Sequence, residues 1–568
     1  MAPAEPDHAP FRIQGEEPHF AEEREGWKGY IEWEKYPEKK KQAQEVLSRY
    51  DFPVPPEFQL KPLPQTNPIL EGVRWKYYHY AMGETLKNQP EISWKYVQEE
   101  KSSDMTHVLQ FPYNGEPPRE RLVKTEITPN EDFFVRNHGG IPEIDADKFF
   151  FDVEGMVNNP KTITLKELQD ESIFPRMTKT ASLQCSGTRR IEQIQEYPGD
   201  GDELINAPWA EGAIGTARWT GVSLKKVIKY CGGLKDGGKH VEFFGADTYF
   251  KKGQVFNYAV SVPYRKVRVH EVMLAWEMNG KPLPRIHGYP LRVVVFGFIG
   301  ARSCKWLYKI NVIAQPSLAP VQMKEYIYYS PQIGKHNNTY SNGFSIQTMP
   351  VSSAIMTPLN HDQIVHDGKI KLTGWAFSGS GWPERVEVSG DGGNIWYEVP
   401  FDQLSKKVFY SWRVWEYEMP VDAEGWLEFC VRCWDNALNT QPTFVRSAWN
   451  WDLHVTSSCH RIKVYSMNRN KPATARRLKQ CEEQGVPMLP ITRPIEFDVE
   501  TEEEYLANMT MRHGRDPEDT LKAALEADGA SPPSCGEFTP DLQPDKEQPS
   551  KHPSPKSRRK CGWKTQGR

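Results

Sequence analysis

A change in the apolar pattern near residue 350 constrains the possible folds of this 568-residue chain more than any other feature. From about Thr125, alternating segments such as Phe149–Gly155 mix with short helical patterns such as Ser223–Tyr230. These segments lack the regular strand–helix alternation of a parallel sheet, which favours an α+β domain. From Ser352 to Tyr465, short alternating segments separated by turn residues are typical of a β-sandwich. The chain is therefore expected to hold an α+β domain followed by an all-β domain.

The pattern also predicts individual elements, since apolar spacing distinguishes helices from strands. In the first region, helices are expected at Leu165–Asp170, Ser223–Tyr230 and Glu271–Asn279, and strands at Phe149–Gly155, Val241–Asp247 and Leu291–Gly300. In the second region, strands are expected at Ile370–Phe377, Arg385–Ser389, Ile395–Val399 and Trp426–Trp434.

The two ends of the chain differ in composition from both regions. The first hundred residues are charged and rich in proline and aromatic residues, with a helix expected at Pro37–Tyr50 because proline suits a first helical position. The last hundred residues hold an acidic helix, expected at Thr501–Leu506, and then a Pro/Ser/Lys-rich tail with too little apolar content to pack. We therefore expect an extended N-terminal segment (1–105), the α+β domain (106–348), the all-β domain (349–468) and a mostly disordered C-terminal extension (469–568).

Charge, hydropathy and cysteine usage exclude several classes of protein. Lys+Arg 71 and Asp+Glu 75 nearly cancel, so the chain lacks the basic balance of a general nucleic-acid binder. No apolar run reaches the length of a membrane span. The nine cysteines are scattered and odd in number, as expected of reduced thiols rather than a disulfide framework. Because no secretory, transit or C-terminal peroxisomal signal is evident, we expect an intracellular and most simply a cytosolic protein.

The stretch Thr180–Arg190 carries the most informative chemistry. Its thiol, Cys185, precedes a flexible Ser-Gly pair, and two guanidinium groups follow at Arg189 and Arg190. A thiol near fixed cations ionises more readily, and thiolates bind soft metals. Guanidinium groups offer planar pairs of donors to an oxyanion. Taken alone, the stretch fits a buried cysteine beside surface arginines at least as well, because single-cysteine motifs are weak.

Three other groups of residues have the composition of a binding or metal site. Arg136, Asn137 and His138 follow an apolar strand end, where rigid scaffolds present polar groups, although the Gly-Gly after them also fits a plain turn. The segment Gly233–His240 nearly spells a phosphate-binding loop, but a histidine replaces the required hydroxyl and the segment follows a helix, which argues against a nucleotide. The C-x-x-C at Cys430 lies on an expected strand, where its two thiols point to opposite faces, which argues against zinc.

Several long motifs in a fixed order carry a resemblance to a known family. They are Phe134–His138 (FVRNH), Leu183–Arg190 (LQCSGTRR), Gly212–Trp219 (GAIGTARW), Glu277–Arg292 (EMNGKPLPRIHGYPLR), Gly300–Leu307 (GARSCKWL) and Asp391–Trp396 (DGGNIW). Residues from about Pro129 to Val464 therefore resemble the molybdenum-cofactor core of the eukaryotic sulfite oxidase and nitrate reductase family. The resemblance implies a mixed α/β molybdopterin-binding domain followed by an immunoglobulin-like dimerisation domain.

The resemblance also implies roles for individual residues. Cys185 would be the protein thiolate on molybdenum. The molybdopterin cofactor would be held by Phe134, Val135, Arg136, Asn137, His138, Cys185, Asp247, His287, Arg292, Ser303, Cys304 and Lys305. The catalytic residues and the substrate pocket would comprise Cys185, Tyr326, Arg136, Arg190 and Trp209.

By the same resemblance, the chain would oxidise sulfite to sulfate by oxo transfer and would form a homodimer. No haem or flavin segment is evident in the sequence, so oxygen or an external carrier would accept the electrons. Two alternatives stay open: a nitrate reductase-like enzyme or another oxidoreductase acting on an oxyanion or an S- or N-oxide, and a non-catalytic cofactor-binding dimer scaffold.

The chain departs from the family pattern at three places. Trp449–Asp452 reads Trp-Asn-Trp-Asp where sulfite oxidases carry Trp-Asn-Leu-Arg, so an acid replaces the arginine that would approach the anion. Thr188 replaces the usual asparagine after the cysteine, and Ile286 replaces the aspartate before His287. The first departure reverses a charge at the substrate side of the implied site.

Overall fold

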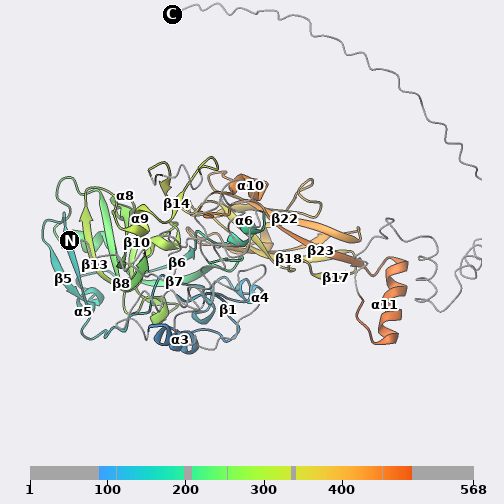
Figure 1. Cartoon of the computed structure of the whole chain (residues 1–568), viewed down its shortest axis with the longest axis horizontal. Helices are drawn as coiled ribbons and strands as arrows, with labels where there is room; N and C mark the ends of the chain where they lie inside the picture. The colour runs from blue at the N-terminus through green and yellow to red at the C-terminus, as the bar shows by residue number, and fades with distance from the viewer. Residues whose placement is uncertain are drawn as a thin grey trace, which may run out of the picture. The chain divides into compact units, whose positions relative to one another are not determined.

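The computed structural model describes residues 89–488, apart from 110–111, 197–206, 252–253, 334–338, 340 and 451. The helices expected at Pro37–Tyr50 and Thr501–Leu506, and the C-terminal tail, lie outside the described residues. The described part consists of an α+β domain followed by an all-β domain, which confirms the predicted fold class (Figure 1). Among these residues, every helix is too short or too polar to cross a bilayer.

Two five-stranded sheets build the first domain, and their pairing is antiparallel except between β13 and β4. One sheet has the order β5-β4-β13-β8-β9, from β4 (Phe150–Gly155), β5 (Lys161–Thr164), β8 (His240–Lys251), β9 (Gln254–Pro263) and β13 (Leu307–Ile313). The other has the order β11-β10-β7-β6, with β12 also paired to β10, from β6 (Met177–Gln184), β7 (Ile214–Ser223), β10 (Val272–Met278), β11 (Lys281–Pro282) and β12 (Arg292–Val295). Both sheets contribute to one hydrophobic cluster, to which β4 gives Val153, β9 gives Val260 and β10 gives Leu274.

Short helices connect these strands, as the sequence predicts at two places. The helices are α5 (Leu165–Gln169), α6 (Arg190–Glu196), α7 (Leu224–Tyr230), α8 (Tyr264–Arg268) and α9 (Pro320–Met323). The side chain of Thr164 caps α5 by accepting the backbone N–H of Glu167 at 3.2 Å, which satisfies one of the unpaired donors at the helix start.

The helix predicted at Glu271–Asn279 is wrong, because this segment forms the strand β10. It pairs with β7 on one side, where Leu274 lies opposite Val222, and with β12 on the other, where Val272 lies opposite Val295. A strand buried on both faces reads as a continuous apolar run, which periodicity cannot separate from a buried helix. The strand predicted at Leu291–Gly300 is shorter than expected, because the chain turns at Gly297 with φ 75° and the regular pairing ends at Val295.

The described N-terminal residues pack against the first domain rather than apart from it. Helix α3 (Gln89–Glu100) buries Tyr96 and Val97 in a cluster with Ile286 and Trp306. A three-stranded sheet follows, from β1 (Thr106–Leu109), β2 (Asn114–Glu116) and β3 (Val135–Arg136), with the short helix α4 (Arg119–Leu122) between β2 and β3. Residues 89–105, which the sequence analysis assigns to the N-terminal extension, thus help to build the wall near His287.

The second domain is a sandwich of two sheets around its own core. One sheet has the order β16-β18-β21, from β16 (Ser352–Thr357), β18 (Lys369–Phe377) and β21 (Arg413–Pro420). The other has the order β17-β23-β22-β19-β20, from β17 (Gln363–His366), β19 (Pro383–Ser389), β20 (Tyr397–Glu398), β22 (Gly425–Asp435) and β23 (His460–Asn468). The core between them includes Leu372, Val386, Trp415 and Phe429. The helices α10 (Val445–Ala448) and α11 (Pro472–Gln484) lie before and after β23.

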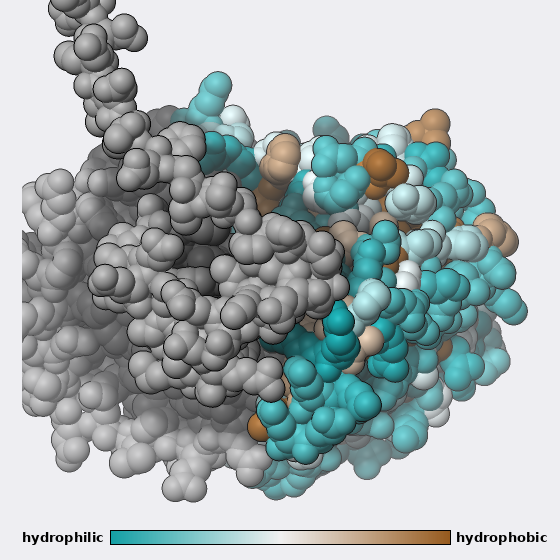
Figure 2. All heavy atoms as spheres, turned by 90° about the vertical axis from the view of Figure 1, so that its right-hand side faces the viewer, coloured by the Kyte–Doolittle hydropathy of each residue, from teal (hydrophilic) through white to brown (hydrophobic). Residues whose placement is uncertain are grey.

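The described residues present a mainly hydrophilic face and free thiols. On the face drawn in Figure 2, the described residues are mainly hydrophilic, and hydrophobic side chains appear singly or in small groups. Every cysteine in the described part of the chain is a free thiol, including Cys430 and Cys433 on β22.

Candidate active site

The thiol of Cys185 lies at the end of β6, in a tight turn that presents it to a cavity. The backbone N–H of Cys185 donates to Ala213 at 2.9 Å, and its Sγ accepts the backbone N–H of Gly187 at 3.4 Å. A Cβ on Gly187 would lie 2.5 Å from the guanidinium of Arg190. The Ser-Gly pair after the cysteine therefore allows Arg190 to pack under the turn.

The cavity next to Cys185 is lined by groups from distant parts of the chain. Ten of its lining residues are among those predicted from the sequence: Phe134, Arg136, His138, Cys185, Asp247, His287, Arg292, Ser303, Lys305 and Tyr326. The remaining ones, which sequence reasoning missed, are Phe133, Leu183, Tyr258, Gly300 and Ala301. The missed residues are apolar, small or a strand tyrosine, so no motif chemistry distinguished them from ordinary core residues.

At one end of the cavity, buried cations surround a histidine. His287 is 3% exposed, and its Nε2 lies 3.1 Å from Nζ of Lys101. Arg292 donates to the carbonyls of His287 at 2.8 Å and Ser303 at 3.2 Å, and its guanidinium carbon lies 4.9 Å from the ring centre of Trp219. Burial lowers the pKa of His287 well below its usual range, and the nearby cations add to this effect. This end of the cavity is suited to a buried anion, because each cation there loses the stabilisation of water.

An acid and a lysine face each other beside this cationic end. Burial raises the pKa of Asp247 to about 7, while Lys305 opposes the shift. Burial also lowers the pKa of Lys305 well below its usual range. The ammonium of Lys305 donates to Oδ1 of Asn137 and, at 3.1 Å, to the carbonyl of Ile286. Asn137 thus reaches the site through Lys305, although it is not among the residues that line the cavity.

At the other end, Arg136, Tyr326 and His138 lie near the thiol. The hydroxyl of Tyr326 lies 2.6 Å from Nε2 of His138. Burial raises the pKa of Tyr326 to about 12, so its hydroxyl stays protonated and can donate. Burial lowers the pKa of Arg136, but Tyr326, Cys185 and Glu325 raise this pKa by a larger amount. The net shift is therefore upward. The guanidinium therefore stays charged in the cavity wall.

Besides Asn137, four predicted site residues do not line the cavity. Val135 belongs to the cluster under α3, and Cys304 lies in the core, where burial raises the pKa of its thiol well above the usual range. Trp209 is fully buried and its Nε1 has no hydrogen-bond partner. Arg190 donates to the carbonyls of Ala207 at 2.7 Å and Leu453 at 2.8 Å. These residues support the wall of the cavity rather than line it. Core packing positions Val135, Cys304 and Trp209, and a loop of the second domain positions Arg190.

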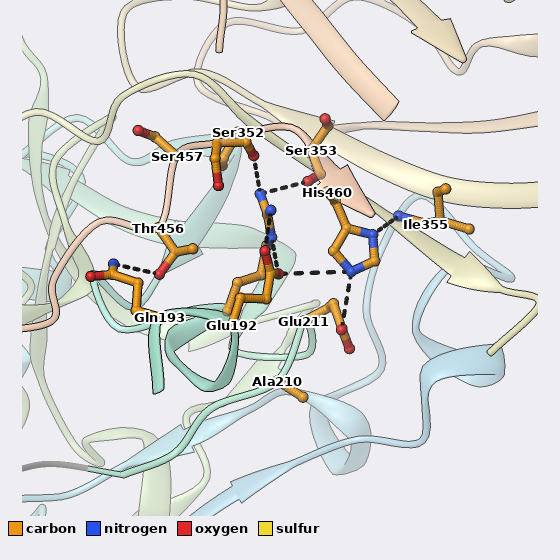
Figure 3. A network of polar contacts seen from close by, with 12 residues as sticks. Glu192, Gln193, Ala210, Glu211, Ser352, Ser353, Ile355, Thr456, Ser457 and His460 are labelled. Carbon is orange, nitrogen blue, oxygen red and sulfur yellow. Dashed lines mark hydrogen bonds and ion pairs between the residues drawn. The ribbon is translucent and has the colours of Figure 1, made fainter. Parts of the chain in front are cut away.

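A polar network joins the cysteine turn to the second domain. Arg189 binds Glu192 with two hydrogen bonds, at 2.5 and 2.6 Å, and donates to the carbonyls of Ser353 and Ser458. Figure 3 shows that Glu192, Glu211 and His460 point toward one another, and their ligand-type atoms lie within 4.8 Å.

This trio is accounted for by ion pairing. Nδ1 of His460 accepts the backbone N–H of Ile355 at 3.0 Å, so Nε2 carries the ring proton and faces Glu211 at 3.2 Å. A metal on Nε2 would require the opposite tautomer. Burial opposes ionisation of Glu211, but Arg119 at 2.6 Å and His460 together lower the pKa of this carboxyl to about 2. The network therefore fixes the cysteine turn against the second domain.

Comparisons with known proteins agree with this geometry. The profile of the oxidoreductase molybdopterin binding domain family matches residues 138–321, and that of the Mo-co oxidoreductase dimerisation domain family matches residues 343–467. The sulfite oxidase of Gallus gallus is 37% identical over 359 residues, covering 62% of this chain and 76% of that protein. The chain belongs to the molybdopterin-dependent oxidoreductase family.

Other members of the family extend this comparison. The mitochondrial sulfite oxidase of Homo sapiens is 37% identical over 63% of this chain and 65% of its own length, and nitrate reductase [NADH] 1 of Phaseolus vulgaris is 32% identical over 62% of this chain and 42% of its own length. The sulfane dehydrogenase SoxCD of Paracoccus pantotrophus has the same fold, with a TM-score of 0.51 at 23% identity, over 62% of this chain and 84% of that chain.

The donor set of this family member fits a molybdopterin cofactor. Buried polar atoms without a partner lie beside the cationic end, namely Nδ2 of Asn137 and Oδ1 of Asp247. Unpaired buried polar groups are costly, so they indicate a missing ligand with both hydrogen-bond donors and acceptors. Arg292, Lys305 and His287 would hold the anionic part of the cofactor, Asp247 would accept from its amino groups, and the thiolate of Cys185 would bind the metal.

Lys101 extends the site beyond the predicted motifs, and its replacement by methionine should reduce cofactor loading. Its ammonium donates to the carbonyls of Asn130 at 2.6 Å and Phe133 at 2.7 Å and contacts His287, so it fixes two walls of the cavity. Burial lowers the pKa of Lys101 to about 7, and an anion nearby would favour its charged form. We expect Lys101→Met to weaken cofactor retention by roughly 10- to 100-fold, as for other outer-shell partners of a metal site.

Molybdenum per protomer, measured by mass spectrometry on purified protein, checks this expectation. The matched control is Lys95→Met on helix α3, which ends just before Lys101, because the side chain of Lys95 is 63% exposed. Full loading of Lys101→Met, even with a lower melting temperature, would contradict the positioning role.

Proposed function

We propose that this protein oxidises sulfite to sulfate, using a molybdopterin cofactor and either oxygen or an external carrier as the electron acceptor. The observation that carries the proposal is the meeting of Cys185, Arg136 and Tyr326 around one cavity, whose lining also holds the cationic side chains Arg292 and Lys305. The relatives named sulfite oxidase support it, because they are 37% identical to this chain over 359 and 362 residues.

The residues of the chain would bind and orient the substrate. Arg136 would hold the oxyanion by charge-assisted hydrogen bonds, and the protonated hydroxyl of Tyr326 would donate one more. His138 would orient this hydroxyl through the 2.6 Å contact between Nε2 and the phenol. The cofactor would supply oxo transfer and the two-electron change from sulfite to sulfate, with the oxygen coming from water. Burial of the cavity would strengthen each of these interactions, since water screens them poorly there.

A paired assay tests the proposal. Sulfite oxidation is measured with ferricyanide or oxygen as acceptor, and nitrate reduction is measured with reduced viologen as donor, on the same holoenzyme. We expect sulfite turnover to exceed nitrate turnover by a wide margin. Faster nitrate turnover would favour the nitrate reductase-like alternative, which the Phaseolus vulgaris relative makes the second candidate. A protein with molybdenum and neither activity would favour a different oxyanion, S-oxide or N-oxide, or a scaffold.

We also propose that the protein is an intracellular homodimer formed through the second domain. The match of residues 343–467 to a dimerisation family supports this assembly, and closed two-fold symmetry is the commonest form of homo-oligomer. Sedimentation velocity at micromolar concentration is expected to give the mass of a dimer. Deletion of residues after 348 should then leave a monomer or an insoluble product, and a monomer of the full chain would contradict the proposal.

A further inference from the structure

A loop of the second domain brings an acid and an imidazole against the substrate end of the cavity. His454 is 3% exposed, and its ring centre lies 5.2 Å from that of Tyr326 at an angle of 30°. The backbone N–H of Val455 donates to the carbonyl of Ser186 at 2.6 Å, which ties the loop to the residue after Cys185. Asp452 stands in this loop at the position where the family resemblance of the sequence implies an arginine. The loop therefore places an acid close to the substrate pocket.

Hydrogen bonds fix the protonation of the imidazole. A guanidinium can only donate, so the 3.3 Å contact from Arg190 makes Nδ1 of His454 an acceptor. Ser186 Oγ lies 3.1 Å from the same nitrogen. Nε2 then carries the proton and donates to Oδ2 of Asp452 at 3.1 Å. The ring is neutral in this arrangement, and the carboxylate of Asp452 interacts electrostatically with Arg190.

The backbone holds this loop in a costly conformation. Leu453 has φ 51° and Val455 has φ 57°, and a β-branched residue with positive φ is strained. Asn450 stabilises the turn, because its Oδ1 accepts the N–H of His454 at 3.2 Å and its Nδ2 donates to the carbonyl of His454 at 2.6 Å. Such strain persists where the surroundings over-determine it, so the position of Asp452 and His454 is built into the fold.

The pair changes the charge that a substrate meets. The donors of Arg190 are directed to Ala207, Leu453 and His454, and its charge is offset by Asp452. Arg136, by contrast, lines the cavity. We propose that the Asp452–His454 pair weakens the binding of doubly charged oxyanions in this pocket more than that of singly charged ones. The reason is that one fixed negative charge repels a dianion twice as strongly as a monoanion of the same shape. This inference rests on the proposed function, within which the pair shifts binding from sulfite toward hydrogensulfite.

Two tetrahedral anions that differ by one charge test this selection without turnover. Sulfate and perchlorate are titrated into the holoenzyme by calorimetry at constant ionic strength. In Asp452→Asn, which keeps an oxygen to accept from His454, we expect sulfate to bind roughly tenfold more tightly and perchlorate roughly threefold, as one partly screened charge implies. Asp452→Glu keeps the charge and should retain the wild-type preference.

The control is Asp422→Asn, which removes the same charge from a side chain that is 90% exposed in the same domain, and it should change neither affinity. Equal changes for both anions in Asp452→Asn, or no change, would overturn the inference. If that variant does not fold, Asp452→Ser is titrated in its place, and the same two outcomes would overturn the inference. The expected charge preference in an enzyme that fails to oxidise sulfite would refute the proposed function and leave the selection intact.

Discussion

Replacement of Cys185 by serine should abolish sulfite turnover while leaving the fold intact. Serine is nearly the same size as cysteine, and the backbone contacts of residue 185 to Ala213 do not involve the side chain. A hydroxyl is a harder and far less acidic ligand than a thiolate, so the metal would lose its protein sulfur. The loss of an outer-shell partner of a metal site costs roughly 10- to 100-fold in activity. We expect kcat to fall by more than this in Cys185→Ser, because a direct ligand is lost.

The matched control is Cys231→Ser, at a fully buried thiol that lies in the core of the same domain. Burial raises the pKa of this thiol to about 11, so it stays protonated. Cys231→Ser should cost stability but keep the turnover per molybdenum. Wild-type turnover in Cys185→Ser would contradict the role of the thiol.

Replacement of Arg136 by methionine should raise the KM for sulfite more than it lowers kcat. The guanidinium lines the cavity and stays charged, because Tyr326, Cys185 and Glu325 outweigh the effect of burial on its pKa. A hydrogen bond to a charged group contributes about 1.5–3 kcal/mol, which corresponds to roughly 10- to 150-fold in KM. Steady-state kinetics of loaded enzyme checks this, with Arg218→Met as a control, since Arg218 is an exposed residue on β7 of the same domain. A similar KM for Arg136→Met and wild type would show that the anion binds elsewhere.

The sequence predicts the cavity best where the functional residues lie within motifs. Cys185, His287 and Lys305 stand in segments whose order and spacing are specific, and the structure brings these three separate segments of the first domain together. The segment at Glu271–Asn279 is different, because burial on both faces of β10 removes the alternation that would mark a strand. Local pattern thus identifies chemistry more readily than it identifies the pairing of a central strand.

Contacts between distant parts of the chain were not predicted from the sequence. Lys101 lies 186 positions before His287, and no motif connects the two. Arg190 is in the motif, yet its direction is set by the carbonyl of Leu453 in the second domain, 263 positions later. Such contacts depend on how domains pack, which periodicity and short motifs do not encode.

The coordination of molybdenum in the holoenzyme tests the central claim most directly. X-ray absorption at the molybdenum edge counts the sulfur neighbours of the metal in the wild-type protein and in Cys185→Ser. The cavity geometry predicts that the variant, loaded with the same amount of molybdenum, loses one sulfur neighbour relative to the wild type. An unchanged sulfur count would show that Cys185 does not bind the metal, and the assignment of this cavity as the molybdenum site would be wrong.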